Sequence, residues 1–233
     1  MKIWIFKAAA IAKVAAACAM PGIANAAEPK DVIRIGYANI ASRGSSTDLV
    51  GPPGTTPPGI GMSVKDAKVF ALSYERQFSP NWALQFQGGI PPTVTALGAG
   101  TGSAVGEATK ARIWFPSVLT IYTFTDVPVV RPYIGAGVTY TFFTNEKATP
   151  GYTAAFGGSS TSAKLSSSWG PTVRLGVEYP LDDRWSLRFE YSTFRLKTKG
   201  TLVTQTPGVG AIARSTNIKG HPRILGASLG YSF

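Results

Sequence analysis

Seven charged residues are the clearest candidates for chemistry, because each falls on or beside the polar side of a segment in which apolar and polar residues alternate. They are Arg34, Glu75, Arg131, Arg174, Glu178, Arg188 and Glu190. Bases and acids are nearly balanced among them. If these segments enclose a common interior, the charges must pair there, because an unpaired buried ion is strongly destabilising. The pattern predicts a buried network of ion pairs, which we call the polar plug.

The sequence offers little for catalysis. His221 is the single histidine and Cys18 the single cysteine. A serine–histidine–acid triad would need a carboxylate beside His221, whereas Glu178 and Glu190 belong to the predicted interior. The Gly- and Ser-rich segment 157–160 is interpreted as a flexible linker, not a phosphate-binding loop. We therefore predict a protein that is not an enzyme, with no cofactor and no metal site.

Apolar and polar residues alternate with a period of two from residue 32 onward, which predicts β-strands. At the C-terminus, for example, Leu229, Tyr231 and Phe233 alternate with Gly230 and Ser232. The segment 115–124 is apolar on both faces, so its orientation stays open. Eight segments are counted in all: 33–38, 70–75, 82–87, 115–124, 133–143, 169–179, 185–192 and 223–233.

The connections between these segments alternate in length. Short ones span 79–81, 126–130 and 182–184, and long ones, rich in Gly, Ser, Thr and Pro, span 41–66, 91–111, 144–168 and 198–221. All long connections therefore emerge at one end, as in bacterial outer-membrane barrels. We predict an all-β fold, an eight-stranded antiparallel transmembrane β-barrel with short periplasmic turns and four long extracellular loops. The alternative is a soluble lipocalin-like barrel whose apolar side chains face inward.

The composition agrees with a membrane barrel. Only 15% of the 233 residues are charged, against roughly 25% in ordinary soluble domains. No apolar run of about 20 residues occurs outside the N-terminus, which excludes a helical membrane bundle. At the N-terminus, two lysines, an Ala-rich stretch and small residues at 24–26 predict a signal peptide over residues 1–26, with the outer-membrane barrel domain at 27–233. Lipidation of Cys18 is the alternative interpretation of this segment.

Three blocks of the sequence resemble the OmpW family of small outer-membrane barrels, which includes AlkL-type importers of hydrophobic compounds. The blocks are Arg-Pro-Tyr-Ile-Gly-Ala-Gly and its continuation at 131–143, the segment 168–185, and the ending at 226–233. The resemblance covers the whole predicted mature chain. It implies an eight-stranded barrel in the outer membrane with a narrow apolar channel for small hydrophobic molecules.

The predicted function is an outer-membrane channel for passive uptake of small hydrophobic molecules. A plug below and an apolar funnel above would force the solute to leave sideways into the outer leaflet. Pro116, Pro132 and Pro171 either mark openings in the wall or only shape its rim. The alternative is a structural barrel whose loops bind surface partners without transport. Apolar loop residues are the candidate uptake contacts: Ile60, Met62, Val64, Val94, Leu97, Tyr152 and Phe156.

Further expectations concern partners. Leu229, Tyr231 and Phe233 are the candidate assembly signal for the barrel-assembly machinery, since outer-membrane proteins commonly end in an aromatic residue. The net charge of +11, with many Lys and Arg residues at the predicted outer end, favours contact with outer-membrane lipid, including the phosphates of lipopolysaccharide. No motif for nucleic-acid binding accompanies this charge.

Overall fold

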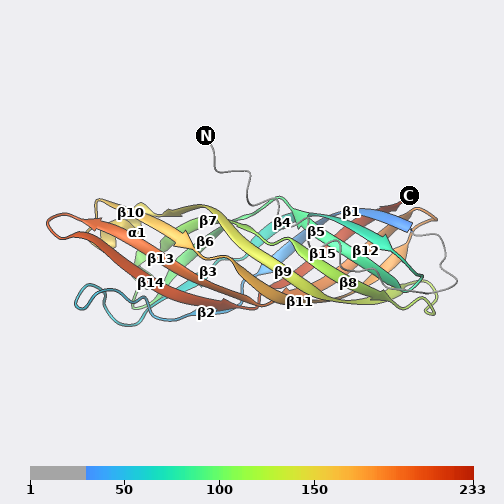
Figure 1. Cartoon of the computed structure of the whole chain (residues 1–233), viewed down its shortest axis with the longest axis horizontal. Coiled ribbons are helices and arrows are strands. Elements are labelled where there is room, and N and C mark those ends of the chain that lie inside the picture. Colours follow the sequence, from blue (N-terminus) through green and yellow to red (C-terminus); the bar gives the residue numbers. More distant parts are fainter. Residues whose placement is uncertain (1–29) are drawn as a thin grey trace.

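The computed structural model describes residues 30–233, and the predicted signal peptide at residues 1–26 lies outside the described residues. Eight antiparallel strands form a closed ring in which β1 pairs with β15 and β9 with β11, so the predicted barrel and its strand count are confirmed (Figure 1). The strands are β1 (Lys30–Ala41), β4 (Ala67–Gln77), β5 (Trp82–Gly89), β8 (Ser117–Thr123), β9 (Arg131–Ala148), β11 (Ser168–Pro180), β12 (Trp185–Phe194) and β15 (Arg223–Ser232).

The barrel continues beyond the point where loops are predicted. Further strands extend it away from Lys30 and Phe233 and pair in the order β3, β6, β7, β9, β10, β13, β14, β2 (Figure 1). We call this part, residues 42–66, 90–116, 142–167 and 195–222, the extension. It contains β2 (Gly44–Ser46), β3 (Ile60–Val64), β6 (Thr93–Gly100), the 3-10 helix η1 (Ser103–Val105), β7 (Glu107–Trp114), α1 (Pro150–Ala155), β10 (Ser160–Leu165), β13 (Leu196–Thr206) and β14 (Gly210–Gly220).

The segment 157–160, interpreted from its composition as a flexible linker, is part of this ordered extension. It follows α1, whose N-terminus is capped by the Thr149 side chain, and the N–H of Gly158 donates to the carbonyl of Thr153 at 2.9 Å. Ser160 then begins β10, opposite Gln205 of β13. Pairing with a strand distant in the sequence orders this segment, and local composition carries no signal of that pairing.

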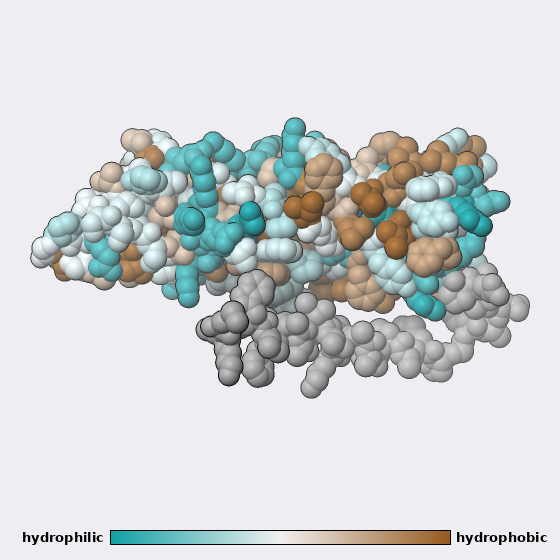
Figure 2. Space-filling view, turned by 90° about the horizontal axis from the view of Figure 1, so that it is seen from above, coloured by the Kyte–Doolittle hydropathy of each residue, from teal (hydrophilic) through white to brown (hydrophobic). Residues whose placement is uncertain are grey.

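The outer surface of the barrel is an apolar band. Figure 2 shows hydrophobic residues gathered over the half of the molecule that carries the barrel strands, and more hydrophilic residues over the extension. Strand after strand exposes large apolar side chains, such as Ile35, Leu72, Val173 and Leu225, with exposed fractions above 50%. Side chains in this register face lipid in an outer-membrane barrel. Among the described residues, no helix is long and apolar enough to cross a bilayer.

Aromatic pairs flank this band at both ends. Near the periplasmic turns, the rings of Trp82 and Tyr122 lie 4.9 Å apart, as do those of Trp185 and Tyr231. At the outer end, the rings of Trp114 and Phe142 are stacked at 5.7 Å, and those of Tyr140 and Trp169 lie 4.7 Å apart. Rings of this kind prefer the headgroup level of a membrane, so the two sets mark its boundaries.

The structure also orients the segment 115–124. In β8, Leu119 and Ile121 are fully buried inside the barrel, while Val118 and Tyr122 lie on the other side of the strand. Leu119 and Ile121 pack with Ala83 and Tyr133 in a small apolar cluster. Leu119 and Ile121 therefore lie low in the barrel, beside the charged interior described next, while Phe115 packs against a separate apolar cluster with Phe194.

Candidate functional site

Six of the seven charged residues predicted for the polar plug meet in the barrel interior. Arg34 comes from β1, Glu75 from β4, Arg174 and Glu178 from β11, and Arg188 and Glu190 from β12. Five of them are less than 10% exposed. The period of two places them there, because alternate residues of each strand point into the lumen. Three arginines and three glutamates balance in charge, as buried ions require.

Arg188 lies at the centre of the plug. Its Nη1 donates to Oε2 of Glu75 at 2.7 Å, and its Nη2 donates to Oε2 of Glu178 at 2.6 Å. Arg34 also donates to Glu178, and to the hydroxyl of Ser186 at 3.0 Å. Glu178 thus bridges two arginines, and Glu75 binds Arg188 with the Nε of Arg34 4.0 Å away. This arrangement offsets the cost of removing these ions from water.

Arg174 joins this centre to the other side of the lumen. Its Nη1 lies 3.5 Å from Oε2 of Glu190, and its guanidinium donates to the side-chain amides of Gln85 and Gln87 on β5. The hydroxyl of Tyr133 donates to Glu190 at 3.2 Å. Gln85, Gln87 and Tyr133 are absent from the predicted plug, although the same alternation places them on the inner side of their strands.

Arg131 corrects the predicted plug. It begins β9 on the inner register, two residues before Tyr133, yet its side chain is exposed. Register alone places it with the plug, but the first residue of a strand lies at the mouth of the barrel, where water solvates the charge.

Gly230, which faces Arg34 across the β1–β15 ladder, also shapes the plug. A Cβ added at Gly230 would lie 2.9 Å from Cζ of Arg34. Glycine there leaves room for the guanidinium.

An apolar layer covers the plug on the extracellular side. Ala38, Ile40, Val69, Phe194 and Ile224 form a buried cluster inside the upper barrel. The side chains of Ala67, Phe115 and Leu196 pack against this cluster, and the rings of Phe115 and Phe194 stack at 6.0 Å. Along β1, β4 and β12 the inner surface therefore changes from charged to apolar within a few residues, whereas β9 and β11 place the buried hydroxyls of Thr139 and Thr172 on the inner side.

Above this layer lies a cavity of about 180 Å³. Its walls come from both the barrel and the extension, and most of the side chains in them are apolar, among them Ile40, Phe115 and Phe194 from below and Met62 and Leu202 from above. An apolar cavity of roughly 150 Å³ is large enough to hold benzene. The site can therefore hold a small hydrophobic molecule without moving the plug.

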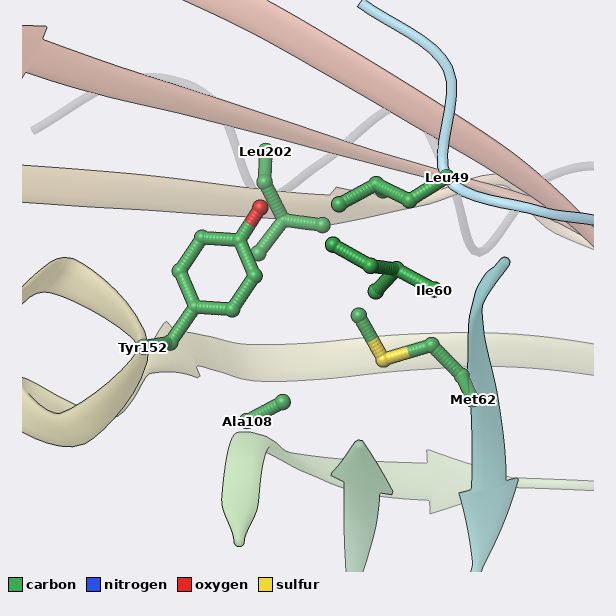
Figure 3. Close-up of a cluster of buried hydrophobic side chains, with 6 residues drawn as sticks. All are labelled: Leu49, Ile60, Met62, Ala108, Tyr152 and Leu202. Atoms are coloured by element: carbon green, nitrogen blue, oxygen red, sulfur yellow. The ribbon is translucent and has the colours of Figure 1, made fainter. Parts of the chain in front are cut away.

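The outer end of the extension is filled by an apolar core. Figure 3 shows Leu49, Ile60, Met62, Ala108, Tyr152 and Leu202 directed toward one another. Met62 and Leu202 also line the cavity, so the core and the cavity share a wall. Burial raises the pKa of Tyr152 to about 12, against the opposing effect of Arg214, so this phenol stays neutral.

The structure thus places the candidate uptake contacts inside the extension, not on mobile loops. Ile60, Met62 and Tyr152 belong to the core, and Phe156 packs against it. Val64 and Val94 line the cavity. Leu97 of β6 is partly buried and lies outside both the core and the lining of the cavity.

Arg214 holds the outer end of the extension together. It is 3% exposed, and its guanidinium lies 4.1 Å from the ring centre of Phe156. It also donates to the hydroxyl of Thr56 at 3.1 Å and to the carbonyl of Thr55 at 2.8 Å. One side chain of β14 therefore links the segment before β3 to the end of α1.

The wall of the extension has a break beside the cavity. β9 pairs with β11 up to Thr141 and Ser168, and with β10 at Lys147 and Ser162, in one continuous register. Between these points, 142–146 faces 163–167, and no ladder pair joins the two stretches of the described chain. The contact across the break is a hydrogen bond from the N–H of Leu165 to the Glu146 carboxylate at 2.7 Å.

The cavity reaches this break. Phe143 and Glu146 on one side, and Ala163, Lys164 and Leu165 on the other, all line it. The break lies directly above the outer aromatic girdle, because Tyr140 and Trp169 flank its lower edge.

The prolines proposed as openings do not coincide with the break. Pro132 and Pro171 each face a partner residue in the ladder between β9 and β11. The carbonyl of Pro116 accepts a hydrogen bond from the N–H of Tyr140. The wall is therefore paired at all three positions.

Comparison with known proteins decides the family. The model of the OmpW family matches residues 28–233, which is most of the chain. The chain belongs to the OmpW family. Its location is therefore the outer membrane, and the resemblance inferred from the three sequence blocks is confirmed.

Individual relatives of this OmpW-family barrel are distant. The chain is 26% identical over 210 residues to outer membrane protein W of Vibrio cholerae, covering 87% of this chain and 88% of that protein. It is 29% identical over 169 residues to the dibenzothiophene metabolism operon protein PahQ of Pseudomonas aeruginosa, covering 71% and 72%. The crystal structure of OprG from Pseudomonas aeruginosa superposes with a TM-score of 0.75 at 23% identity, covering 88% and 95%, which supports the fold.

The candidate assembly signal lies on the outer surface. Leu229 of β15 and Phe233, directly after this strand, are exposed, and Tyr231 packs against Trp185. The N–H of Phe233 donates to the carbonyl of Asp31 at 2.9 Å, so the last residue is paired with the first barrel strand. Recognition of these residues by the barrel-assembly machinery stays a prediction.

Proposed function

We propose that this OmpW-family barrel is a passive channel for small hydrophobic molecules, with release through its wall into the outer leaflet and no enzymatic activity. The observation that carries the proposal is the apolar interior of the extension, which ends on a plug of buried ion pairs. From outside inward, the apolar core, the cavity and the apolar layer share residues: Met62 belongs to the first two, and Ile40 and Phe194 to the last two.

The energetics favour a hydrophobic solute and oppose its passage through the plug. Each buried CH₂ group gains about 0.8 kcal/mol on leaving water, so the cavity concentrates apolar molecules. Continuing downward would break buried ion pairs, at about 3–5 kcal/mol for each partner removed. It would then return the solute to the water of the periplasm. Exit through the wall above the aromatic girdle avoids both costs.

The names of relatives support the same substrate class. PahQ, 29% identical to this chain, is named for an operon of dibenzothiophene metabolism. Dibenzothiophene is a flat, apolar aromatic compound, and aromatic rings suit a cavity whose walls include Phe115, Phe143 and Phe194. We infer that the solutes of this channel are small aromatic or aliphatic molecules.

Filling the cavity tests the proposal. Gly200 lines the cavity, and a Cβ added there meets only ordinary contacts, at 3.5 Å or more. Gly200→Phe therefore directs a ring into the free space without a backbone clash. Thr201→Phe is the matched control, because the next residue of β13 points to the other side of the strand.

The measurement is uptake of a radiolabelled monoaromatic compound by cells that express each variant at equal levels, with a polar dye reporting membrane damage. We expect Gly200→Phe to reduce uptake to the level of cells without the protein, while Thr201→Phe keeps it. Equal uptake by cells with Gly200→Phe, cells with Thr201→Phe and cells without the protein would favour the alternative, a structural barrel whose loops bind surface partners.

Lateral release is tested by closing the break. Thr144 and Leu165 would face each other if the register of the ladder continued, so Thr144→Cys with Leu165→Cys allows a bifunctional thiol reagent to join the two strands. We expect the crosslinked channel to lose uptake. The pair Ser160→Cys with Gln205→Cys, placed opposite in the β10–β13 ladder, is the control and should keep it. Full uptake with the break crosslinked would exclude this route.

A further inference from the structure

A sector of the outer surface carries unpaired basic side chains just above the apolar band. It comprises Arg43, Arg195, Lys197, Lys199, Lys219, His221 and Arg223, all exposed. They lie where β12 meets β13, where β14 meets β15 and where β1 meets β2, and these strands are neighbours in the sheet. We call this sector the basic face. Within the described residues, no member forms an ion pair.

The register brings two of these charges directly together. Lys197 of β13 and Lys219 of β14 are Cα partners, and both point outward. Residues so placed have Cβ atoms about 5 Å apart, and like charges directly opposite are destabilising. The stretches 193–200 and 217–225 hold no Asp or Glu. At the neighbouring edge, Asp66 accepts a hydrogen bond from the N–H of Ser42.

The opposite part of the extension provides a contrast. There, β7 and β9 bring Lys110 and Lys147 face to face in the same way. However, the Glu107 carboxylate lies 2.8 Å from Nζ of Lys110 and 2.9 Å from Nζ of Lys65. The chain therefore supplies its own anion beside one pair of opposed lysines and none beside the other.

The height of the basic face indicates where its anion comes from. On β15, Arg223 stands two residues beyond Leu225, which is 63% exposed in the lipid-facing band. Two residues along a strand span about 6.7 Å, so Arg223 lies at the level where hydrocarbon gives way to headgroups. Trp169 of the outer girdle is close by, since a Cβ at the adjacent Gly170 would touch the backbone of Arg195.

We propose that the basic face is a binding surface for the phosphates of the outer-leaflet glycolipid, with Lys197 and Lys219 gripping one phosphate between them. Lysine ammonium groups make charge-assisted hydrogen bonds to phosphate oxygens. A phosphate between the two lysines also removes their mutual repulsion. Arg43, at the edge of the basic face, lines the cavity, but Lys197 and Lys219 do not, so the phosphate site proposed between the two lysines is separate from the proposed channel.

The test uses the purified full-length mature protein in detergent, with lipid A as the probe and native mass spectrometry to measure its binding. Dephosphorylated lipid A with the same acyl chains separates phosphate recognition from hydrophobic contact. Lys197→Gln with Lys219→Gln removes the proposed contacts. Lys110→Gln with Lys147→Gln removes equal charge from the other opposed pair. Inorganic phosphate, added as a competitor, separates a lipid site from a site for free anions.

We expect the Lys197/Lys219 double variant to bind lipid A about tenfold more weakly, since each cation near an anionic lipid surface contributes measurably to binding. The Lys110/Lys147 variant should bind as the unmodified protein does. Dephosphorylated lipid A should bind equally weakly to all three proteins, and millimolar inorganic phosphate should not displace lipid A. The proposal would be overturned if the Lys197/Lys219 variant bound lipid A as tightly as the unmodified protein does. It would also be overturned if the unmodified protein bound dephosphorylated lipid A as tightly as lipid A. Displacement by inorganic phosphate would assign the face to free anions.

Discussion

The lower and upper parts of the lumen are filled in opposite ways. In the lower barrel, Arg34, Glu75 and Arg188 form a paired network that leaves little free space. In the extension, Met62 and Leu202 line a cavity of about 180 Å³. Paired charges fix their geometry through directional hydrogen bonds, whereas apolar contacts tolerate displacement by another apolar molecule. This difference suits a plug that stays closed below a cavity that binds and releases small molecules.

The largest expected effect comes from breaking the plug. Glu178 accepts hydrogen bonds from Arg34 and Arg188, so Glu178→Lys would leave three cations together in the interior. Removing one partner of a buried pair typically costs about 3–5 kcal/mol of unfolding free energy. We expect the midpoint of unfolding in urea to fall clearly. The measurement is the heat-modifiable migration of the folded barrel on gels, recorded at increasing urea concentration. Asp183→Lys, in an exposed periplasmic turn, is the control for added charge. An unchanged midpoint for Glu178→Lys would show that the network does not stabilise the barrel.

The extension should respond differently to loss of its core. Tyr152 is 1% exposed within the apolar core. Tyr152→Ala would create a cavity there and lower the unfolding free energy by about 3 kcal/mol. Because the side chain lies above the membrane boundary, we expect faster proteolysis of 145–165, with normal gel migration of the barrel. Val50→Ala, at a side chain that is 64% exposed, is the control. Loss of barrel stability equal to that of Glu178→Lys would mean that the two parts unfold as one unit.

The lower barrel is predictable from sequence because most of its strands face two uniform environments, lipid outside and small or polar side chains inside. Trp185, Leu187 and Phe189 alternate with Ser186 and Arg188 for this reason. The exception is β8, which carries Leu119 and Ile121 on its inner side and gives no clear alternation. Register predicts all seven plug charges in the interior, and six of them lie there. Register does not show that Arg131 lies at the mouth of the barrel, because a period of two gives the side of the strand that a residue faces and not the depth of the residue in the barrel.

The extension was hidden for a physical reason. Its strands face water outside and a mixed interior, so their alternation is weak: Thr198 and Gly200 of β13 point inward and Lys197 and Lys199 outward. Ordering there depends on partners far along the chain, as between Ser160 and Gln205. The apolar residues in the long connections were visible in the sequence. Their packing into a core was not.

The smallest expected effect is a pH dependence at Glu107, which lies beside one of the two opposed lysine pairs of the extension. Hydrogen bonds and charge from Lys110, and then from Lys65, lower the pKa of Glu107 from 4.5 to about 2. A lowered carboxyl pKa in the folded state contributes stability above pH 4.5, and this contribution is lost as the pH falls toward 2. Because all three groups are exposed, we expect a local change only: faster amide exchange in β7 below pH 4, absent in Glu107→Gln.

Direct titration of this carboxyl by carbon NMR should give a midpoint near 2. A midpoint near 4.5 would show that Glu107 does not hold Lys65 and Lys110. The lysines on that side would then be as free as Lys197 and Lys219, and the contrast between the two opposed pairs would disappear. A low midpoint keeps the contrast, because one pair of lysines is then neutralised by the protein itself and the other depends on an anion from outside.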